Sequence, residues 1–335
     1  MLFDRLAELP IEVDGYRLEQ ARHDVATGFV RVTTTVVMDG AGHQGAGEDV
    51  TYTADDHDRF PADLPLAGRR TLAAQSALLE GRELFAAPPQ QGAAHDYRRW
   101  AFESAALDLA LRQAGLSFAG AVGREPRPVR FVLSTRAQIE EWLDLDPSLE
   151  FKLDPEPSWD EQLIDRLAAS ERVRVLDFKA YYTGTPVDVE PDPDQYRLLS
   201  ERFPDAVIED AALTGECRAA LAGALDRLSF DAPIHSLADI DALDVSPRWM
   251  NIKPSRFGTV ERLLEAIEAC EQRGIRMYGG GQFELGRGRR QIQALASTFY
   301  ADGPNDVAPA EYNLGGPRPG LPASPLPAFG AVGFG

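Results

Sequence analysis

The chain has few cysteines, no long apolar run and a shortage of basic residues. Cys217 and Cys270 are its two cysteines, too few for a disulfide framework, so a reducing cytoplasm is the expected compartment. No stretch approaches the roughly 20 apolar residues of a membrane helix. The first residues also lack the basic region and apolar core of a secretion signal. We therefore expect a cytoplasmic protein without a membrane partner.

The charge is strongly one-sided, with 53 acidic and 34 basic residues and a net charge of −19. Such a balance argues against nucleic acid as a partner, because phosphates require a basic surface. Solubility or a salt-tolerant source is the simplest reason for the excess acid. Apolar residues make up 44% and charged residues 26%, as in an ordinary globular protein, and 335 residues suffice for one large domain or two average ones.

The first hundred residues have the pattern of a small α+β domain. Residues 28–38 are rich in β-branched side chains and predict a strand. A turn-rich connector at 40–47 and a second strand at 48–53 would complete an antiparallel hairpin. Residues 69–85 and 97–113 have helical spacing of apolar positions.

From residue 128 onward, strand and helix patterns alternate. Strands are expected at 129–133, 149–153, 172–177, 205–209, 228–231, 249–253 and 275–278, with an eighth at 306–308. Helical patterns separate them, including one at 159–170 with Ser158 as its expected N-cap. So many units indicate a parallel barrel rather than an open sheet. We expect an α+β capping domain at 1–125, a barrel at 126–314 and a Gly/Pro-rich tail at 315–335 that packs back on the cap.

Three of the expected strands end in a carboxylate: Asp177, Glu209 and Asp231. Two others end near a lysine, Lys152 and Lys253. The carboxyl ends of barrel strands carry the chemistry, so these five side chains should share one face. Three hard oxygen ligands would suit Mg²⁺ better than zinc or copper. A single acid at a strand end is more often a helix N-cap, but three in succession beside lysines favour a site.

Several segments resemble the enolase superfamily, in its muconate-lactonising and o-succinylbenzoate-synthase-like branch. The resemblance rests on residues 45–48 (Gly-Ala-Gly-Glu), 103–111, 230–239, 251–258 (Asn-Ile-Lys-Pro-Ser-Arg-Phe-Gly) and 279–286, in that order. It implies an α+β cap on a modified (β/α)7β TIM-type barrel. It also implies Mg²⁺ held by Asp177, Glu209 and Asp231, with Lys152 and Lys253 as catalytic residues on opposite faces of the substrate.

The resemblance implies a lyase or isomerase that removes the α-proton of a small carboxylate through an enediolate. Epimerisation, elimination and cycloisomerisation remain open, as in dipeptide epimerases, o-succinylbenzoate synthases and muconate cycloisomerases. A lysine can be the base only if its pKa falls well below about 10.4, and a nearby Mg²⁺ with partial burial lowers it. Substrate-binding candidates are Lys179, Glu284, Gln20 and Arg22, the last two in a specificity loop expected near residues 18–27. A homo-oligomer is left open.

The sequence departs from the family pattern in places. The family has Lys-x-Lys where this chain has Glu150-Phe151-Lys152. Strand alternation puts Glu150 on the face of Lys152 and predicts an ion pair that would raise the lysine pKa. In the alternative register, Asp154 replaces the base. Glu150 and Ala232, which follows Asp231 where the family has a glutamate, leave open a catalytically inactive barrel that binds ligands or acts as a scaffold. An acid-sugar dehydratase is a second alternative. The dehydratase needs a late histidine, and none follows His235.

Overall fold

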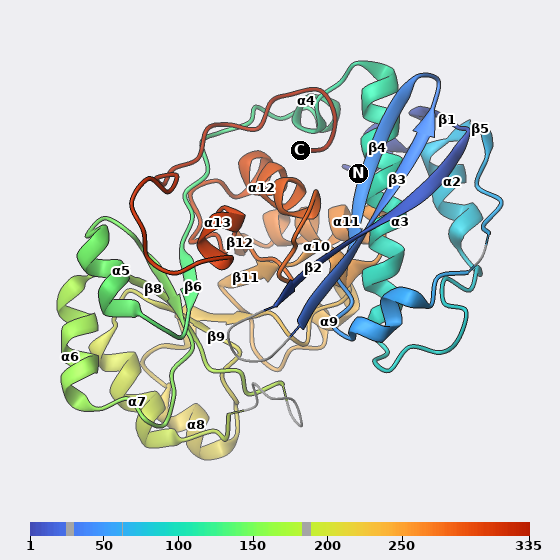
Figure 1. Cartoon of the computed structure of the whole chain (residues 1–335). Coiled ribbons are helices and arrows are strands. Elements are labelled where there is room, and N and C mark those ends of the chain that lie inside the picture. Colours follow the sequence, from blue (N-terminus) through green and yellow to red (C-terminus); the bar gives the residue numbers. More distant parts are fainter. Residues whose placement is uncertain (25–29, 62, 183–188) are drawn as a thin grey trace.

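The computed structural model describes residues 1–24, 30–61, 63–182 and 189–335. An antiparallel N-terminal region lies beside a curled parallel sheet with helices on its outside (Figure 1). Within the described part of the chain, none of the helices has both the length and the apolar character needed to cross a bilayer.

The N-terminal region is built on a three-stranded sheet and one long helix. Its sheet has the order β2 (Gly15–Asp24), β3 (Val30–Gly40), β4 (His43–Asp49), and α3 (Ala94–Ala114) packs against it. Close packing is possible because a Cβ at Gly45 would lie 2.2 Å from the backbone nitrogen of Leu109. Smaller elements complete the region: α1 (Asp4–Ala7), β1 (Pro10–Val13), the 3-10 helix η1 (Ala54–Asp58), β5 (Gly68–Thr71), α2 (Leu72–Leu79) and α4 (Phe118–Val122).

Three sequence predictions for this region are wrong. The helix expected at 69–85 is confined to α2, because residues 69–71 lie in β5 and residues 80–85 are not helical. Strand β4 begins at His43, inside the predicted connector, because Ala41 and Gly42 make a tight turn with φ of +48° and +78°. Residues 18–24 of the predicted specificity loop lie in β2, paired along β3. Most side chains of this strand are exposed and show no alternation of apolar and polar residues, so the pattern carries no strand signal. The remainder of that predicted loop falls outside the described residues.

The parallel sheet has seven strands in the order β12-β11-β10-β9-β8-β7-β6. They are β6 (Leu133–Thr135), β7 (Phe151–Leu153), β8 (Val173–Asp177), β9 (Val207–Glu209), β10 (Leu228–Phe230), β11 (Trp249–Ile252) and β12 (Arg276–Gly279). Single bridges then join Asp306 to Gly280 and Asn305 to Phe131, so this segment lies between the two edges. The predicted barrel fold is confirmed.

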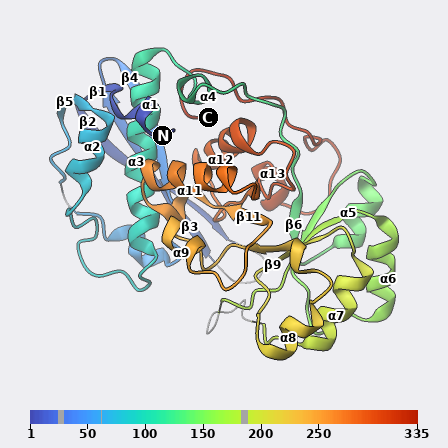
Figure 2. The ribbon, with the colours of Figure 1, turned by 180° about the vertical axis from the view of Figure 1, so that it is seen from behind.

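Helices follow most strands and cover the sheet. They are α5 (Ile139–Leu145), α6 (Glu161–Ser170), α7 (Pro193–Arg202), α8 (Gly215–Ala220), the 3-10 helix η2 (Leu225–Arg227), α9 (Leu237–Asp241), α10 (Pro254–Phe257), α11 (Val260–Gln272), α12 (Gly288–Phe299) and α13 (Ala310–Asn313). Figures 1 and 2 show α5 to α8 on the side away from the N-terminal sheet. Helix α6 is capped by Asp160, which accepts a hydrogen bond from the backbone of Leu163 at 2.8 Å, rather than by Ser158 as predicted.

Two buried side chains join the N-terminal sheet to the barrel. Arg31 of β3 donates to the carbonyls of Gln282 and Phe283, which follow β12. The carboxylate of Glu48 on β4 accepts from the backbone nitrogens of Gly286 and Gly288, at 2.9 and 2.8 Å. The segment after β12 is therefore held by both a cation and an anion from the N-terminal sheet.

The last described residues lie against the N-terminal region. The side chain of Phe334 is buried between the rings of Trp100 and Phe118, with centroid distances of 6.2 and 4.7 Å. Its backbone nitrogen donates to Asp108 at 2.7 Å. The chain thus returns from the barrel to helices α3 and α4.

Replacement of Phe334 by alanine is expected to lower the free energy of unfolding by about 3–5 kcal/mol, because it leaves a cavity between two rings. Urea unfolding followed by circular dichroism measures this. Val332→Ala is the control, since Val332 is 47% exposed and its loss should cost less than about 0.5 kcal/mol. Equal stabilities of the two variants would contradict the packing described.

His57 is held neutral inside the N-terminal region. Its Nε2 lies 2.9 Å from the carbonyl of Thr51, which can only accept, so Nε2 carries the proton. Its Nδ1 then accepts from the hydroxyl of Thr34 at 2.9 Å. Burial lowers the pKa of His57, although the carboxylate of Asp49 opposes the shift.

Because folding lowers the pKa of His57, this histidine becomes protonated at a higher pH in the unfolded chain than in the folded chain. The associated stability is therefore complete above about pH 6.5 and declines below it. We expect the unfolding free energy of wild type to fall more steeply than that of His57→Gln, by up to about 1.4 kcal/mol per pH unit. Denaturant unfolding between about pH 7.5 and about pH 5.5 measures both slopes. Parallel slopes would contradict a neutral buried histidine.

Candidate active site

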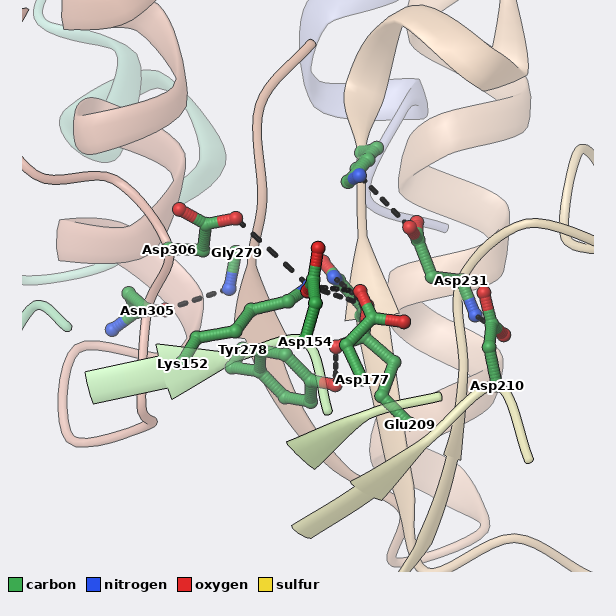
Figure 3. Close-up of polar contacts among 12 residues, drawn as sticks. Lys152, Asp154, Asp177, Glu209, Asp210, Asp231, Tyr278, Gly279, Asn305 and Asp306 are labelled. Atoms are coloured by element: carbon green, nitrogen blue, oxygen red, sulfur yellow. Dashed lines mark hydrogen bonds and ion pairs between the residues drawn. The ribbon is translucent and has the colours of Figure 1, made fainter. Parts of the chain in front are cut away.

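Three carboxylates converge at the carboxyl ends of neighbouring strands. Asp177 ends β8, Glu209 ends β9 and Asp231 follows β10. The register pairs Asp177 with Glu209 directly, and all three side chains are fully buried. One oxygen of each lies within 4.8 Å of the others (Figure 3). The structure therefore brings together the three residues predicted as metal ligands.

Lys152 projects from β7 into this cluster. Its Nζ lies 3.0 Å from Asp177 Oδ2 and 2.5 Å from Glu209 Oε1, and 3.9 Å from Asp306 Oδ2 (Figure 3). Burial alone would lower its pKa, but the carboxylates of Asp177 and Glu209 outweigh burial and raise the pKa of Lys152 well above its usual value. The ammonium is therefore the favoured form while these carboxylates are charged.

Lys253 occupies the other end of the cluster. Its Nζ lies 2.8 Å from Asp231 Oδ2, which also accepts from the hydroxyl of Tyr182 at 2.9 Å. Arg256 approaches the same oxygen at 3.3 Å. Against the effect of burial, the charge of Asp231 raises the pKa of Lys253. The charges of Arg256 and Lys253 in turn outweigh burial and lower the pKa of Asp231.

The predicted Glu150–Lys152 ion pair is wrong. Glu150 accepts from Arg130 Nε at 2.5 Å and from Arg174 Nε at 2.7 Å. The pairing of β7 with β8 skips Arg174, and this bulged residue of β8 supplies one of the two arginines that hold Glu150 at the start of β7. Lys152 is therefore turned to the carboxylate cluster and Glu150 to two arginines.

Lys179 is the substrate-binding candidate that reaches the cluster. Its backbone is left-handed, with φ of +57°, and its Nζ contacts Asp177. The same nitrogen lies 3.6 Å from Asp154, which also accepts from Arg136 at 2.7 Å. Asp154 thus lies close to the cluster. The two registers considered for the lysine motif put either Lys152 or Asp154 at the catalytic position, and both of these charged side chains lie near the three carboxylates.

The other substrate-binding candidates make their contacts elsewhere. Glu284 follows β12, accepts from the backbone of Gln282 at 2.7 Å and lies 3.3 Å from Arg289. Gln20 donates to the carbonyl of His57 and to Asp58, both at 3.1 Å. Arg22 is exposed, 3.8 Å from Asp24. His235, relevant to the dehydratase alternative, faces Asp96 at 3.9 Å.

Sequence reasoning missed several side chains that contact the cluster. Tyr278 donates to Glu209, and Asn251 donates to the same carboxylate at 3.2 Å. Arg256 also donates to the backbone carbonyl of Asp231 at 2.6 Å. Strand alternation could have found Asn251, which lies two residues before Lys253 on the same face. Arg256 lies within the 251–258 motif but carried no geometric signal.

The cluster has the chemistry of a site for a hard divalent cation. Three carboxylates supply hard oxygen ligands of the kind such an ion prefers. Asp231 Oδ1 is buried and has no hydrogen-bond partner among the described residues. A buried acceptor left without a donor is costly, and a cation beside it would remove that cost. The residues present therefore fit a divalent cation.

Family models match most of the chain. Residues 4–121 match the N-terminal domain, and residues 125–314 the C-terminal domain, of a family described as a domain of unknown function, DUF8230. The chain belongs to this family.

Two curated proteins are similar in sequence. An N-succinylamino acid racemase from Amycolatopsis sp is 26% identical over 65% of this chain and 61% of its own length. An o-succinylbenzoate synthase from Bacillus subtilis (strain 168) is 25% identical over 62% of this chain and 57% of its own length. The chain thus spans about three fifths of the curated relatives it matches.

Solved structures share the fold over nearly the whole chain. An enolase-superfamily member from Listeria innocua has a TM-score of 0.62 and 18% identity, covering 90% of this chain and 86% of its own. A dipeptide epimerase from Methylococcus capsulatus complexed with Mg ion has a TM-score of 0.67 and 18% identity, covering 89% and 90%. The fold is therefore that of solved enolase-superfamily structures, as the resemblance implied, and the racemase and synthase names of the two curated relatives agree with the predicted class of isomerases and lyases.

Proposed function

We propose that this chain is a Mg²⁺-dependent enzyme that removes the α-proton of a small carboxylate substrate. The observation that carries the proposal is a buried cluster of three carboxylates with a lysine amine at each end. Lys152 Nζ lies 3.0 Å from Asp177, and Lys253 Nζ lies 2.8 Å from Asp231. Buried titratable groups with perturbed pKa values concentrate at functional sites, and both lysines have such values.

Asp177, Glu209 and Asp231 would hold the Mg²⁺. When bound, the ion supplies positive charge that stabilises the enediolate left by removal of an α-proton. The positive charge of the ion also affects the pKa values of the two lysines. The neighbouring carboxylates raise the pKa of Lys152 and Lys253. A further positive charge shared by those carboxylates opposes this shift and favours a neutral amine, which is the form that can accept a proton.

The positions of the two amines set what each could do. Their carboxylate contacts are separate, Asp177 and Glu209 for Lys152 and Asp231 for Lys253. A substrate between them would meet an amine on each side. Proton removal by one and return by the other gives epimerisation, whereas elimination or cycloisomerisation needs one base and one cation. The names of the relatives, a racemase and an o-succinylbenzoate synthase, support both outcomes as candidates.

Exchange of the α-proton tests the proposal whichever product the enzyme forms. The purified chain is incubated in deuterated water with N-succinyl amino acids, dipeptides or muconolactone, with Mg²⁺ or with a chelator, and the α-proton signal is followed by NMR. Formation of o-succinylbenzoate from its precursor is followed in parallel. We expect Mg²⁺-dependent exchange or product with at least one substrate class. Failure with every class, despite bound Mg²⁺, would contradict catalysis.

A catalytically inactive barrel is the second candidate, and one observation favours it. Each carboxylate in the cluster already has a cationic neighbour: Lys152 and Lys179 contact Asp177, Lys152 contacts Glu209, and Lys253 contacts Asp231. Such pairing could be a purely structural core. Absence of α-proton exchange would support this candidate over the enzyme: with bound Mg²⁺ the barrel would be an inactive metal-binding protein, and without Mg²⁺ binding the cluster would be a structural core.

A further inference from the structure

Asp210 lies next to the carboxylate cluster but makes contacts of a different kind. Its side chain is fully buried, and its two oxygens accept from the backbone nitrogens of Asp231 and Ala232, at 2.8 and 2.9 Å. Figure 3 shows this side chain turned toward the backbone of Asp231 rather than into the cluster. It therefore holds the chain where the third carboxylate leaves β10.

The backbone of Asp210 joins the other two strand ends. Its nitrogen donates to the carbonyl of Ser229 on β10 at 3.0 Å. Its carbonyl accepts from the nitrogen of Ala180 at 3.0 Å, three residues beyond Asp177. Because Asp210 directly follows Glu209, one residue is connected to the carboxyl ends of β8, β9 and β10.

The backbone at this point is in an uncommon conformation. Asp210 has φ of +50°, in the left-handed region that disfavours most residues and that Asp and Asn tolerate better than others. Lys179 on the neighbouring strand end has φ of +57°. Left-handed residues concentrate where surrounding structure must fix an exact geometry, as at ligand sites. Two adjacent strand ends are bent in this way just beyond Asp177 and Glu209.

We propose that Asp210 is a positioning residue that sets the spacing of the Asp177, Glu209 and Asp231 carboxylates for a divalent cation. The inference rests on the proposed function, because it presumes that this cluster binds Mg²⁺. Asp210 acts through hydrogen bonds to backbone and is not itself a ligand. Loss of such supporting contacts typically weakens metal binding by about 10- to 100-fold.

Two substitutions separate the side-chain contacts from the backbone conformation. Asp210→Gly keeps the left-handed backbone at no steric cost but removes both acceptors. Asp210→Asn keeps the shape and one acceptor, while its amide group faces the second backbone nitrogen. The matched control is Asp108→Asn, since Asp108 also accepts from two backbone nitrogens, those of Phe334 and Ala46, away from the cluster.

The readouts are the Mg²⁺ dissociation constant from calorimetry and the melting temperature without metal. We expect the dissociation constant to rise by about 10- to 100-fold in Asp210→Gly and by less in Asp210→Asn. Asp108→Asn should lower the melting temperature and leave the dissociation constant unchanged. A merely structural role would instead shift the melting temperatures of all variants without separating their affinities for Mg²⁺.

The outcomes distinguish this inference from the proposed function. Wild-type affinity in a folded Asp210→Gly variant overturns the role of Asp210 and leaves the metal site intact. Absence of Mg²⁺ binding by wild type overturns the metal site and the inference together. If Asp210→Gly does not fold, the comparison of Asp210→Asn with Asp108→Asn decides in the same way.

Discussion

Replacement of Lys253 by methionine is expected to slow α-proton exchange by about 10²- to 10⁴-fold, the usual contribution of a positioned acid or base. Methionine keeps the length and apolar stem of the side chain but cannot accept or donate a proton. Asp231 would retain its contacts with Arg256 and Tyr182, so the carboxylate should stay in place. The chain should therefore keep its affinity for Mg²⁺ while it loses exchange.

Lys152→Met is the paired variant, because it removes the amine at the other end of the cluster. If both amines transfer protons, each variant loses epimerisation of its substrate. If Lys152 acts only as a cation, Lys152→Met lowers the rate without changing which enantiomer exchanges. NMR of the separate enantiomers in deuterated water measures this. Exchange of both enantiomers at the wild-type rate in Lys253→Met would remove Lys253 from the mechanism.

Replacement of Glu209 by glutamine is expected to weaken Mg²⁺ binding by about 100-fold or more. Loss of a residue that only supports a metal ligand weakens binding by roughly 10- to 100-fold, and loss of a ligand should weaken it further. Glu209 is the middle residue of the three, and its carboxylate also accepts from Lys152, Tyr278 and Asn251. Glutamine removes one negative charge. Its amide nitrogen is itself a donor, so it cannot accept the hydrogen bonds that the Glu209 carboxylate now receives. Exchange should fall with metal occupancy.

Glu150→Gln is the matched control for this substitution. Glu150 is also paired with cations, but its partners are Arg130 and Arg174, outside the cluster. The control should reduce stability at most and leave the Mg²⁺ dissociation constant unchanged. Calorimetric titration of both variants provides the comparison. Similar affinities of Glu209→Gln and wild type would show that this carboxylate is not a ligand.

The convergence of the three acids was predictable from the sequence, because it follows from a general property of parallel barrels. Each apolar run predicts a strand, and a run that ends in an acid places that acid at the strand's carboxyl end. Asp177, Glu209 and Asp231 needed no more than this. The two lysines followed for the same reason, although their roles remain proposals.

The partners of individual side chains were less predictable, because they depend on local irregularities. Glu150 pairs with Arg130 and with Arg174, the residue of β8 that the β7–β8 register skips, and no alternation pattern foresees these partners. The sequence of strand β2 resembles that of a loop, because most of its side chains are exposed and apolar residues do not alternate with polar ones. No sequence pattern indicated a role for Asp210, because its side chain contacts backbone atoms at the end of another strand.

The central claim is that the buried carboxylates form a Mg²⁺ site rather than a structural set of ion pairs. Calorimetric titration of the purified, chelator-treated chain with Mg²⁺ tests it most directly. The account predicts one ion per chain, with the affinity weakened by about 100-fold or more in Glu209→Gln and retained in Glu150→Gln. Absence of binding by wild type at millimolar Mg²⁺ would contradict it, and the cluster would then be a charge-paired core of the barrel.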